Sequence, residues 1–499
     1  MSLPLMQRAA GHHKRLAIID GQGRYSYADL LIAAQEVASC LLTDKHDLGE
    51  ARVAFMVPPS FDYVAVQWGI WQAGGIAVPL CPSHPRPEIE YVIRDTAPQI
   101  VVSHPVFEKK LRPTAKSHNA GFLLTSEAAN TTERSLPNVN VDRRAMILYT
   151  SGTTSTPKGV VTTHQNIMAQ IKTLIDAWEW TADDHILHVL PLHHTHGIVN
   201  TLLCPLWAGA TCEILPKFDA EEVWTRFVNG DLTLFMAVPT IYVKLIASWD
   251  KATVEEQKRM SKACADLRLM VSGSAALPVT VLEKWKAITG HTLLERYGMT
   301  EIGMALSNPL YGERRPGFVG VPLPGVKVRV VDESGQEIKK EGKSGEIQVR
   351  GPIVFLEYWG KPEATRKAFR NGWFCTGDAA VVERGYYRIL GRSSVDIIKT
   401  GGYKVSALEI EEALRTHPAI KECAVVGVDD REWGERVGAA VIPEAGSSLS
   451  LDDLRLWAKK ELASYKIPTR LLLLDELPRN AMGKVTKGEI KRLFEGPCL

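Results

Sequence analysis

The sequence predicts an α/β protein built from more than one domain, and three observations support this. The chain has 499 residues, too many for a single hydrophobic core. Up to about residue 320, short apolar runs alternate with segments of helical spacing, which predicts parallel sheets with helices on their faces. Further on, apolar and polar residues alternate singly, which predicts a small antiparallel barrel or sheet.

Local signals place the elements of the first part. Ser26 suits the N-cap of one helix, and Gly74 follows the end of another. Trp68 and Trp71 lie at helical spacing in that second helix, so we expect them to pack in the core rather than to bind a cofactor. The spacing predicts helices over 25–45, 61–73 and 164–178, and strands over 51–57, 76–80, 146–148, 160–161, 185–190, 234–238 and 267–271. The apolar runs 91–93 and 100–102 continue this alternation.

The last part of the chain changes its pattern twice. Residues 326–331 and 347–350 alternate like antiparallel strands, with turns between them. Gly391 and Arg392 mark a predicted domain boundary, so that residues 1–391 form a large N-terminal domain and 392–499 a small α+β domain. Within the small domain the pattern predicts helices over 407–416 and 451–462, strands over 424–428 and 439–442, and a basic C-terminal helix.

The composition excludes several classes of partner. Hydrophobic residues make up 45% of the chain, charged residues 23%, and the net charge is +2, so neither nucleic acid nor a membrane is an expected partner. No apolar run reaches the roughly 18 residues of a membrane-spanning helix. The eight cysteines are scattered without a CxxC pair, which favours free thiols in a reducing compartment. We therefore expect a cytoplasmic protein, and the mildly basic N-terminus leaves a processed organellar form open.

The segment YTSGTTSTPKGVV, residues 149–161, is a polar loop between two predicted strands. Its hydroxyl groups, its backbone amides and the ammonium group of Lys158 are the groups that bind a polyphosphate. It is not a Walker A motif, because Pro157 precedes the lysine and Gly159 follows it. A polar surface loop without a ligand is the alternative interpretation.

The segment PLHHTHG, residues 191–197, contains three histidines within four positions. A zinc site needs further ligands, and no Cys, His or Asp group elsewhere in the sequence has suitable spacing. We therefore expect no metal at this segment. His193 and His196 are expected to pack or to form hydrogen bonds.

Seven motifs in order resemble those of the adenylate-forming superfamily, which contains acyl-CoA synthetases, luciferases and the adenylation domains of peptide synthetases. The resemblance covers nearly the whole chain. It implies two βαβ-type parallel-sheet subdomains plus a small β-barrel in the N-terminal domain, and a mobile C-terminal domain that carries a catalytic lysine. The motifs are YTSGTTSTPKGVV (149–161), PLHHTHG (191–197), ERYGMTE (295–301), GEIQVRGP (345–352), WFCTGD (373–378), GRSSVDIIKTGGYKV (391–405) and PRNAMGK (478–484).

The same resemblance implies a reaction. Such enzymes attach a carboxylate to the α-phosphate of ATP, release pyrophosphate and pass the acyl group to the thiol of coenzyme A, with Mg²⁺ as the metal. The expected partners are therefore a small-molecule carboxylate and CoA, and the expected assembly is a monomer or a homodimer. Each residue of the implied site, taken alone, also has an ordinary structural explanation.

The resemblance assigns these roles residue by residue. Nucleotide contacts fall to Thr150, Ser151, Gly152, Thr153, Thr154 and Lys158 at the β- and γ-phosphates, Thr300 at the α-phosphate, Gly273, Ser274, Ala275 and Tyr297 at the adenine, and Asp378 and Arg392 at the ribose. Glu301, with Thr150, would bind Mg²⁺. The remaining roles fall to His194 as a gate at the carboxylate pocket, Gly401 and Gly402 at the thiol step, and Lys484 as the catalytic lysine.

Arg296 indicates which carboxylate is used. Most members of the superfamily carry a neutral residue there, whereas residues 295–306 and 391–411 most resemble malonyl-CoA synthetases, including the mitochondrial type. In those enzymes the arginine pairs with the distal carboxylate of the substrate, assisted by a serine that matches Ser274. Malonate or methylmalonate is therefore the expected acid.

Three alternatives stay open at this point. Arg296 can pair with Glu295 or another acid of the chain, in which case the protein is a medium-chain or other acyl-CoA synthetase. The chain can also be an adenylation enzyme that serves a separate carrier protein. A nucleotide sensor without catalytic activity is the third alternative.

Overall fold

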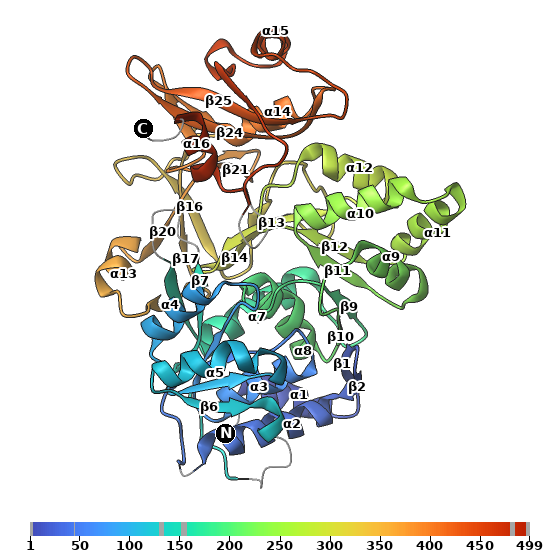
Figure 1. The fold of residues 1–499 in the computed structure, drawn as a ribbon, viewed down its shortest axis with the longest axis vertical. Coiled ribbons are helices and arrows are strands. Elements are labelled where there is room, and N and C mark those ends of the chain that lie inside the picture. Colours follow the sequence, from blue (N-terminus) through green and yellow to red (C-terminus); the bar gives the residue numbers. More distant parts are fainter. Residues whose placement is uncertain (1–2, 44, 129–133, 151–156, 480–484, 496–499) are drawn as a thin grey trace.

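A computed structural model of the chain describes residues 3–43, 45–128, 134–150, 157–479 and 485–495. These residues form four β-sheets with helices on their faces. The N-terminal elements lie at one end of the molecule and the C-terminal elements at the other (Figure 1). The site analysed below lies where the larger sheets meet the antiparallel ones.

A seven-stranded sheet forms the first parallel unit. Helices α4 and α5 pack on one face, whereas α2 and α3 pack on the other. Ser26 caps α2 in a capping box with Asp29, and Gly74, with φ of +80°, follows the end of α3 as predicted. The strand order is β18 (Glu357–Tyr358), β8 (Lys158–Thr163), β7 (Arg144–Thr150), β4 (Ile76–Pro79), β3 (Arg52–Met56), β5 (Ile100–Ser103) and β6 (Gly121–Leu124), and the helices are α2 (Tyr27–Leu42), α3 (Phe61–Gln72), α4 (Arg86–Thr96), α5 (Glu108–Ser117) and α6 (Thr125–Ala128).

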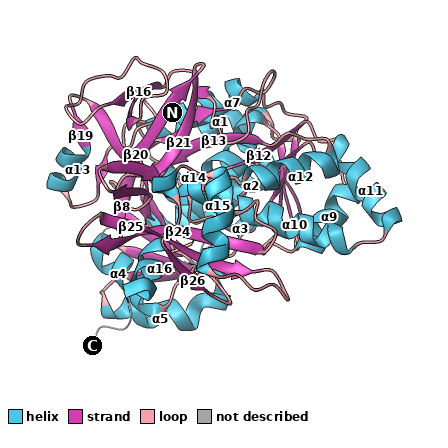
Figure 2. Cartoon of the chain, turned by 90° about the horizontal axis from the view of Figure 1, so that it is seen from above, coloured by secondary structure: helices cyan, strands magenta, loops and turns pink. Residues whose placement is uncertain are grey.

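A nine-stranded sheet forms the second parallel unit. Its helices α9 to α12 cover one face and make a lobe at the side of the molecule (Figure 2). The order is β15 (Val321–Pro322), β14 (Gly303–Ser307), β13 (Leu294–Met299), β12 (Leu269–Ser272), β11 (Leu234–Ala237), β9 (His185–His188), β10 (Thr211–Ile214), β1 (Leu16–Asp20) and β2 (Gly23–Ser26), with α9 (Ala220–Asn229), α10 (Pro239–Lys251), α11 (Val254–Ala265) and α12 (Val279–Thr289). Strands β12 and β13 run parallel, so their carboxyl ends meet at one edge.

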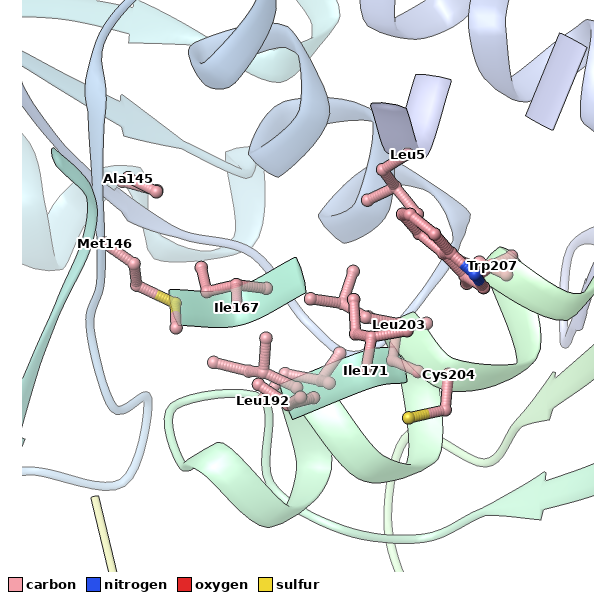
Figure 3. Close-up of a cluster of buried hydrophobic side chains, with 14 of the residues drawn as sticks. Leu5, Ala145, Met146, Ile167, Ile171, Leu192, Leu203, Cys204 and Trp207 are labelled. Carbon is pink, nitrogen blue, oxygen red and sulfur yellow. The ribbon is translucent and has the colours of Figure 1, made fainter. Parts of the chain in front are cut away.

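The core lies between these two sheets. Figure 3 shows Ile167 and Ile171 of α7 (His164–Trp178) against Leu192, Leu203 and Cys204, while Leu5 reaches Trp207. Trp68 and Trp71 are fully buried there, which confirms their predicted packing role. Helix α1 (Pro4–Gly11), a π-helical segment at His196–Leu203 and α8 (Cys204–Ala208) complete this layer.

Two antiparallel sheets follow. The first, predicted as a small barrel or sheet, contains β16 (Lys327–Val331), β17 (Gly345–Arg350), β20 (Trp373–Glu383), β19 (Phe369–Arg370) and β21 (Tyr386–Arg392), with α13 (Pro362–Ala368). The second contains β23 (Tyr403–Ser406), β22 (Ile397–Thr400), β25 (Gly434–Pro443), β24 (Ile420–Asp430) and β26 (Arg470–Leu473), with α14 (Ala407–Leu414), α15 (Leu451–Glu461) and α16 (Lys487–Glu495).

The predicted α/β class with two parallel units is confirmed. Helix 164–178 was predicted with its observed limits, whereas β24 and β25 extend beyond their predicted limits. The two strands pair with each other from Ile420 to Asp430. Their backbone hydrogen bonds extend through polar residues, which the apolar pattern of the sequence does not mark as strand. The boundary at 391/392 stays a prediction.

Candidate active site

The carboxyl ends of β12 and β13 bring together the residues that the sequence singled out. Strand β12 ends at Ser272, and the chain continues through Gly273 to Ser274, whose φ of +69° is unusual for a residue with a side chain. Arg296 lies on β13, directly beneath this turn. A Cβ on Gly273 would lie 2.5 Å from Cζ of Arg296, so a larger residue there would displace the guanidinium group. Ligands of open parallel sheets bind at such strand ends.

Arg296 is a buried cation without a partner carboxylate in the described part of the chain. Arg296 is only 3% exposed, and its Nη2 donates to Oγ of Ser274 at 3.3 Å. The Nε donor has no partner there. Because burial disfavours the charged form, the pKa of Arg296 falls to about 9. The guanidinium group is thus placed to receive an anion.

Glu295 does not neutralise this cation. Consecutive residues of a strand point to opposite faces, and the Glu295 carboxylate accepts instead from the backbone N–H of Gly317 at 3.0 Å. Burial raises the pKa of Glu295 to about 8. The interpretation in which Arg296 pairs with its neighbour Glu295 is therefore wrong.

His196 extends this polar cluster. Its Nδ1 lies 3.2 Å from Oγ of Ser274, which confirms the predicted hydrogen-bonding role. The pKa of His196 lies well below its ordinary value because of burial and the nearby Arg296, so the imidazole is neutral. If the Ser274 hydroxyl accepts from Arg296 and donates to Nδ1, the imidazole proton lies on Nε2, a second buried donor without a partner among the residues that the structure describes. The segment begins a π-helix, a form frequent at functional sites.

The rings of His193 and His194 lie with their centroids 4.2 Å apart and their planes tilted by 53°. Burial lowers the pKa of His194 to about 4, and its Nε2 has no partner among the described residues. Within those residues no group of three or more His, Cys, Asp or Glu side chains could hold a metal ion.

A second cluster joins β13 to the first antiparallel sheet. The hydroxyl of Tyr297 donates to Oδ2 of Asp378 at 2.6 Å, and Nε of Arg392 donates to Oδ1 of the same carboxylate at 3.0 Å. Asp378 and Arg392 are cross-strand partners of β20 and β21, which fixes their distance. The structure thus brings together three residues assigned to the nucleoside.

A third cluster surrounds Glu301. Its Oε1 accepts from the hydroxyl of Tyr358 at 2.9 Å, whereas its Oε2 is buried without a partner in the described residues. Burial raises the pKa of Glu301. The Nζ atom of Lys158 lies 4.9 Å from the centre of the Tyr358 ring. Thr150 is the cross-strand partner of Lys158. An unpaired carboxylate oxygen fits a hard cation such as Mg²⁺.

The remaining predicted site residues belong to none of these three clusters or lie outside the described residues. Gly401 and Gly402 form the turn between β22 and β23, both with positive φ, and the N–H of Gly401 donates to the carbonyl of Trp433. Ala275 is exposed after Ser274, and Thr300 is half-buried before Glu301. Ser151, Gly152, Thr153, Thr154 and Lys484 lie outside the described residues.

Sequence reasoning missed Tyr358. It belongs to the two-residue strand β18, which pairs with β8 although the two are far apart in the chain. So short a strand has no periodicity to detect.

The three clusters lie on an α/β scaffold at the edge where ligands of such sheets bind, which defines a ligand-binding enzyme fold with a built anion site. Models of two families match the chain, the AMP-binding enzymes over residues 5–359 and the C-terminal domain of AMP-binding enzymes over residues 409–484. The chain therefore belongs to the AMP-binding enzyme family, within the adenylate-forming superfamily that the motifs indicated.

Individual relatives are similar over most of their length. The mitochondrial malonate–CoA ligase of Bos taurus is 49% identical over 98% of this chain and 90% of its own. The ATP-bound structure of MatB from Rhodopseudomonas palustris gives a TM-score of 0.91 at 35% identity, with 99% of both chains covered. A ternary product complex of a malonyl-CoA ligase with methylmalonyl-CoA and AMP gives a TM-score of 0.70 at 36% identity, over 96% of this chain and 100% of the other.

Two further observations bear on the environment of the protein. No helix within the described ranges is long and apolar enough to cross a membrane. The seven cysteines that the structure describes are all free thiols, as the scattered spacing predicted.

Proposed function

We propose that the chain is an ATP-dependent, AMP-forming malonate–CoA ligase that also accepts methylmalonate. The observation that carries the proposal is the state of Arg296, a buried cation whose Nε lacks a partner in the described chain. A buried charge without a counter-ion costs several kcal/mol. The distal carboxylate of malonate would remove that cost with bidentate geometry. The relatives named above support the same acid.

The proposed reaction has two steps. In the first, a carboxylate oxygen of malonate attacks the α-phosphorus of ATP, the bond to the bridging oxygen breaks, and pyrophosphate leaves. In the second, the thiol of CoA attacks the acyl carbon, AMP leaves as a phosphate anion, and the thiol proton passes to solvent. Positioning and charge compensation are the contributions that such a site can make.

The nucleotide would occupy the second and third clusters. Tyr297 would stack on the adenine beside Gly273, Ser274 and Ala275, while Asp378, held by Arg392, would accept both ribose hydroxyls. Residues 150–154 and Lys158 would bind the β- and γ-phosphates, and Thr300 the α-phosphate. Mg²⁺ would be held by the free oxygen of Glu301, with Thr150, and when bound it would neutralise phosphate charge.

The remaining assignments concern the carboxylate and the thiol. Ser274 and Arg296 would bind the distal carboxylate, and the neutral His194 would separate the acid from the nucleotide. Lys484 would bridge the reacting oxygens, and the turn at Gly401 and Gly402 would face the entering thiol. We propose that residues 392–499 move as one domain between these two steps, because a single arrangement cannot easily serve both.

The assembly and the compartment are also proposals. We propose a monomer or homodimer that acts on small molecules, in the cytoplasm or, like the bovine relative, in mitochondria. Size-exclusion chromatography with light scattering measures the assembly. Immunofluorescence against organelle markers measures the compartment.

Steady-state kinetics on a panel of acids tests the function. Malonate is expected to exceed acetate, propionate and octanoate in kcat/KM by a factor on the order of a hundred. Arg296→Met should lower kcat/KM for malonate by a similar factor and relax the discrimination. Arg314→Met is the matched control, because that half-buried arginine donates to the carbonyls of Thr292 and Leu310 and should affect stability without changing selectivity.

The same panel separates the alternatives. Octanoate turnover equal to that of malonate would identify an acyl-CoA synthetase of another class. Pyrophosphate release with malonate but without thioester formation on CoA would indicate a separate carrier protein as acceptor. No pyrophosphate release with any acid would leave a nucleotide sensor.

A further inference from the structure

Helix α4 lies beside the hairpin formed by β7 and β8, at the end next to residues 151–156. The hydroxyl of Tyr91 donates to the backbone oxygen of Pro157 at 2.8 Å. Four residues further along α4, Asp95 accepts from the hydroxyl of Tyr149 at 2.5 Å. Residues four apart lie on one face of a helix. A single face of α4 therefore contacts Tyr149 near the end of β7 and Pro157 directly before β8.

Asp95 is itself held from a second side. Its Oδ1 lies 3.3 Å from Nζ of Lys361, and its backbone oxygen accepts from the indole N–H of Trp359 at 3.2 Å. The backbone N–H of Trp359 donates in turn to the carbonyl of Gly159 at 2.8 Å. The end of the hairpin next to residues 151–156 is therefore tied to helix α4 and to the segment that directly follows β18.

These contacts lie where the strand ladder stops. The last cross-strand pairs are Tyr149 with Gly159 and Thr150 with Lys158. Pro157 has no N–H to donate, so the bond from Tyr91 to its carbonyl fixes the chain just beyond the ladder. Because the carbonyl of Pro157 and the N–H of Lys158 belong to one planar peptide group, holding the carbonyl also orients the amide and the start of the Lys158 side chain.

Tyr149 stays a donor at every ordinary pH. Burial raises its pKa, and the Asp95 carboxylate raises it further. Since the phenol keeps its proton, Tyr149 remains the donor in its hydrogen bond to Asp95. Tyr91 and Asp95, on the polar face of α4, thus hold the hairpin at the end next to residues 151–156, and we call this pair the clamp.

We propose that Tyr91 and Asp95 are positioning residues that preorganise Thr150 and Lys158 for the phosphates of ATP. The proposal rests on the proposed function only in taking this hairpin as the phosphate site. Neither side chain needs to touch the nucleotide. Their effect is to lower the conformational freedom that ATP would otherwise have to remove on binding.

The test measures MgATP affinity by isothermal titration calorimetry without any acid present. Tyr91→Phe keeps the ring and removes only the hydroxyl, and it is expected to weaken MgATP binding roughly three- to tenfold, the range for one neutral hydrogen bond. Tyr386→Phe is the matched control, because that hydroxyl, at the start of β21, also donates to a backbone carbonyl, that of Glu313 at 3.1 Å. Its MgATP affinity should match the wild type.

Two further readouts separate positioning from loss of structure. Tyr91→Phe should raise KM for ATP while KM for malonate and the melting temperature stay within error of the wild type. Asp95→Asn keeps an acceptor for Tyr149, so it should bind MgATP more tightly than Asp95→Ala. Wild-type affinity in Tyr91→Phe, or an equal rise in KM for both substrates, would overturn the proposal.

The outcomes also distinguish a failure of this proposal from a failure of the proposed function. A wild-type protein that binds MgATP but does not activate malonate would refute the function, while the affinity ratio of Tyr91→Phe to wild type would still support or refute the clamp. A wild-type protein that fails to bind MgATP would refute both.

Discussion

Gly273→Ala is expected to destroy malonate selectivity by displacing one side chain. An added Cβ would lie 2.5 Å from Cζ of Arg296, 2.6 Å from its Nε and 2.7 Å from its Nη1. The guanidinium group must therefore move by roughly 1 Å to reach ordinary van der Waals contact. The backbone of Gly273 does not have a positive φ, so alanine adds no strain of its own.

The magnitude follows from what a displacement of that size does to a charged hydrogen bond. A hydrogen bond to a charged group contributes about 1.5–3 kcal/mol, so its loss lowers kcat/KM by a factor of about 10 to 150. A shift of about 1 Å in a positioning group has a similar effect on rate. Monocarboxylates lack the distal carboxylate and should lose little.

The assay compares kcat/KM for malonate, methylmalonate, propionate and octanoate between Gly273→Ala and the wild type. Gly488→Ala is the matched control, because nothing lies within 4 Å of a Cβ there and the residue is in helix α16. Titration of MgATP and measurement of the melting temperature show whether the nucleotide site and the fold are intact.

Two results would refute the reasoning. A malonate kcat/KM within threefold of the wild type would mean that Arg296 is not the anchor of the distal carboxylate. An equal loss for all acids, together with weaker MgATP binding, would mean that position 273 acts on the nucleotide instead.

Two predictions concern pH. The pKa of Arg296 is about 9 in the free protein, and a bound carboxylate raises it. The kcat/KM for malonate should therefore fall as the pH rises through 9, whereas the kcat/KM for propionate should not follow that profile. An identical profile for both acids would contradict this origin. Glu295 has a folded pKa of about 8, above its ordinary value of 4.5, so the unfolded state ionises first and stability falls as the pH rises through this interval. Glu295→Gln keeps an acceptor for the N–H of Gly317, so calorimetry should show a raised melting temperature at pH 8.5 and almost none of this gain at pH 5; an equal gain at both would show that ionisation is not the cause.

The sequence by itself determined the architecture and the chemical types at the site. Periodicity placed the strands and helices because burial on one face leaves a mark in the order of residues, as in the helix His164–Trp178. The order of the motifs identified the superfamily. Arg296 was recognisable because a cation stood in a segment where relatives are neutral.

Only the tertiary structure decided what surrounds each of these groups. The surroundings of Arg296 come from Ser274, which follows β12, and from His196 at the start of the π-helix, while the strand geometry turns Glu295 to the opposite face. Tyr358 reaches Glu301, and Tyr91 reaches Pro157, through packing between segments that are far apart in the chain. Such contacts leave no pattern in the sequence because they depend on which faces the sheets and helices turn toward one another, and this is fixed only when the core between them is packed.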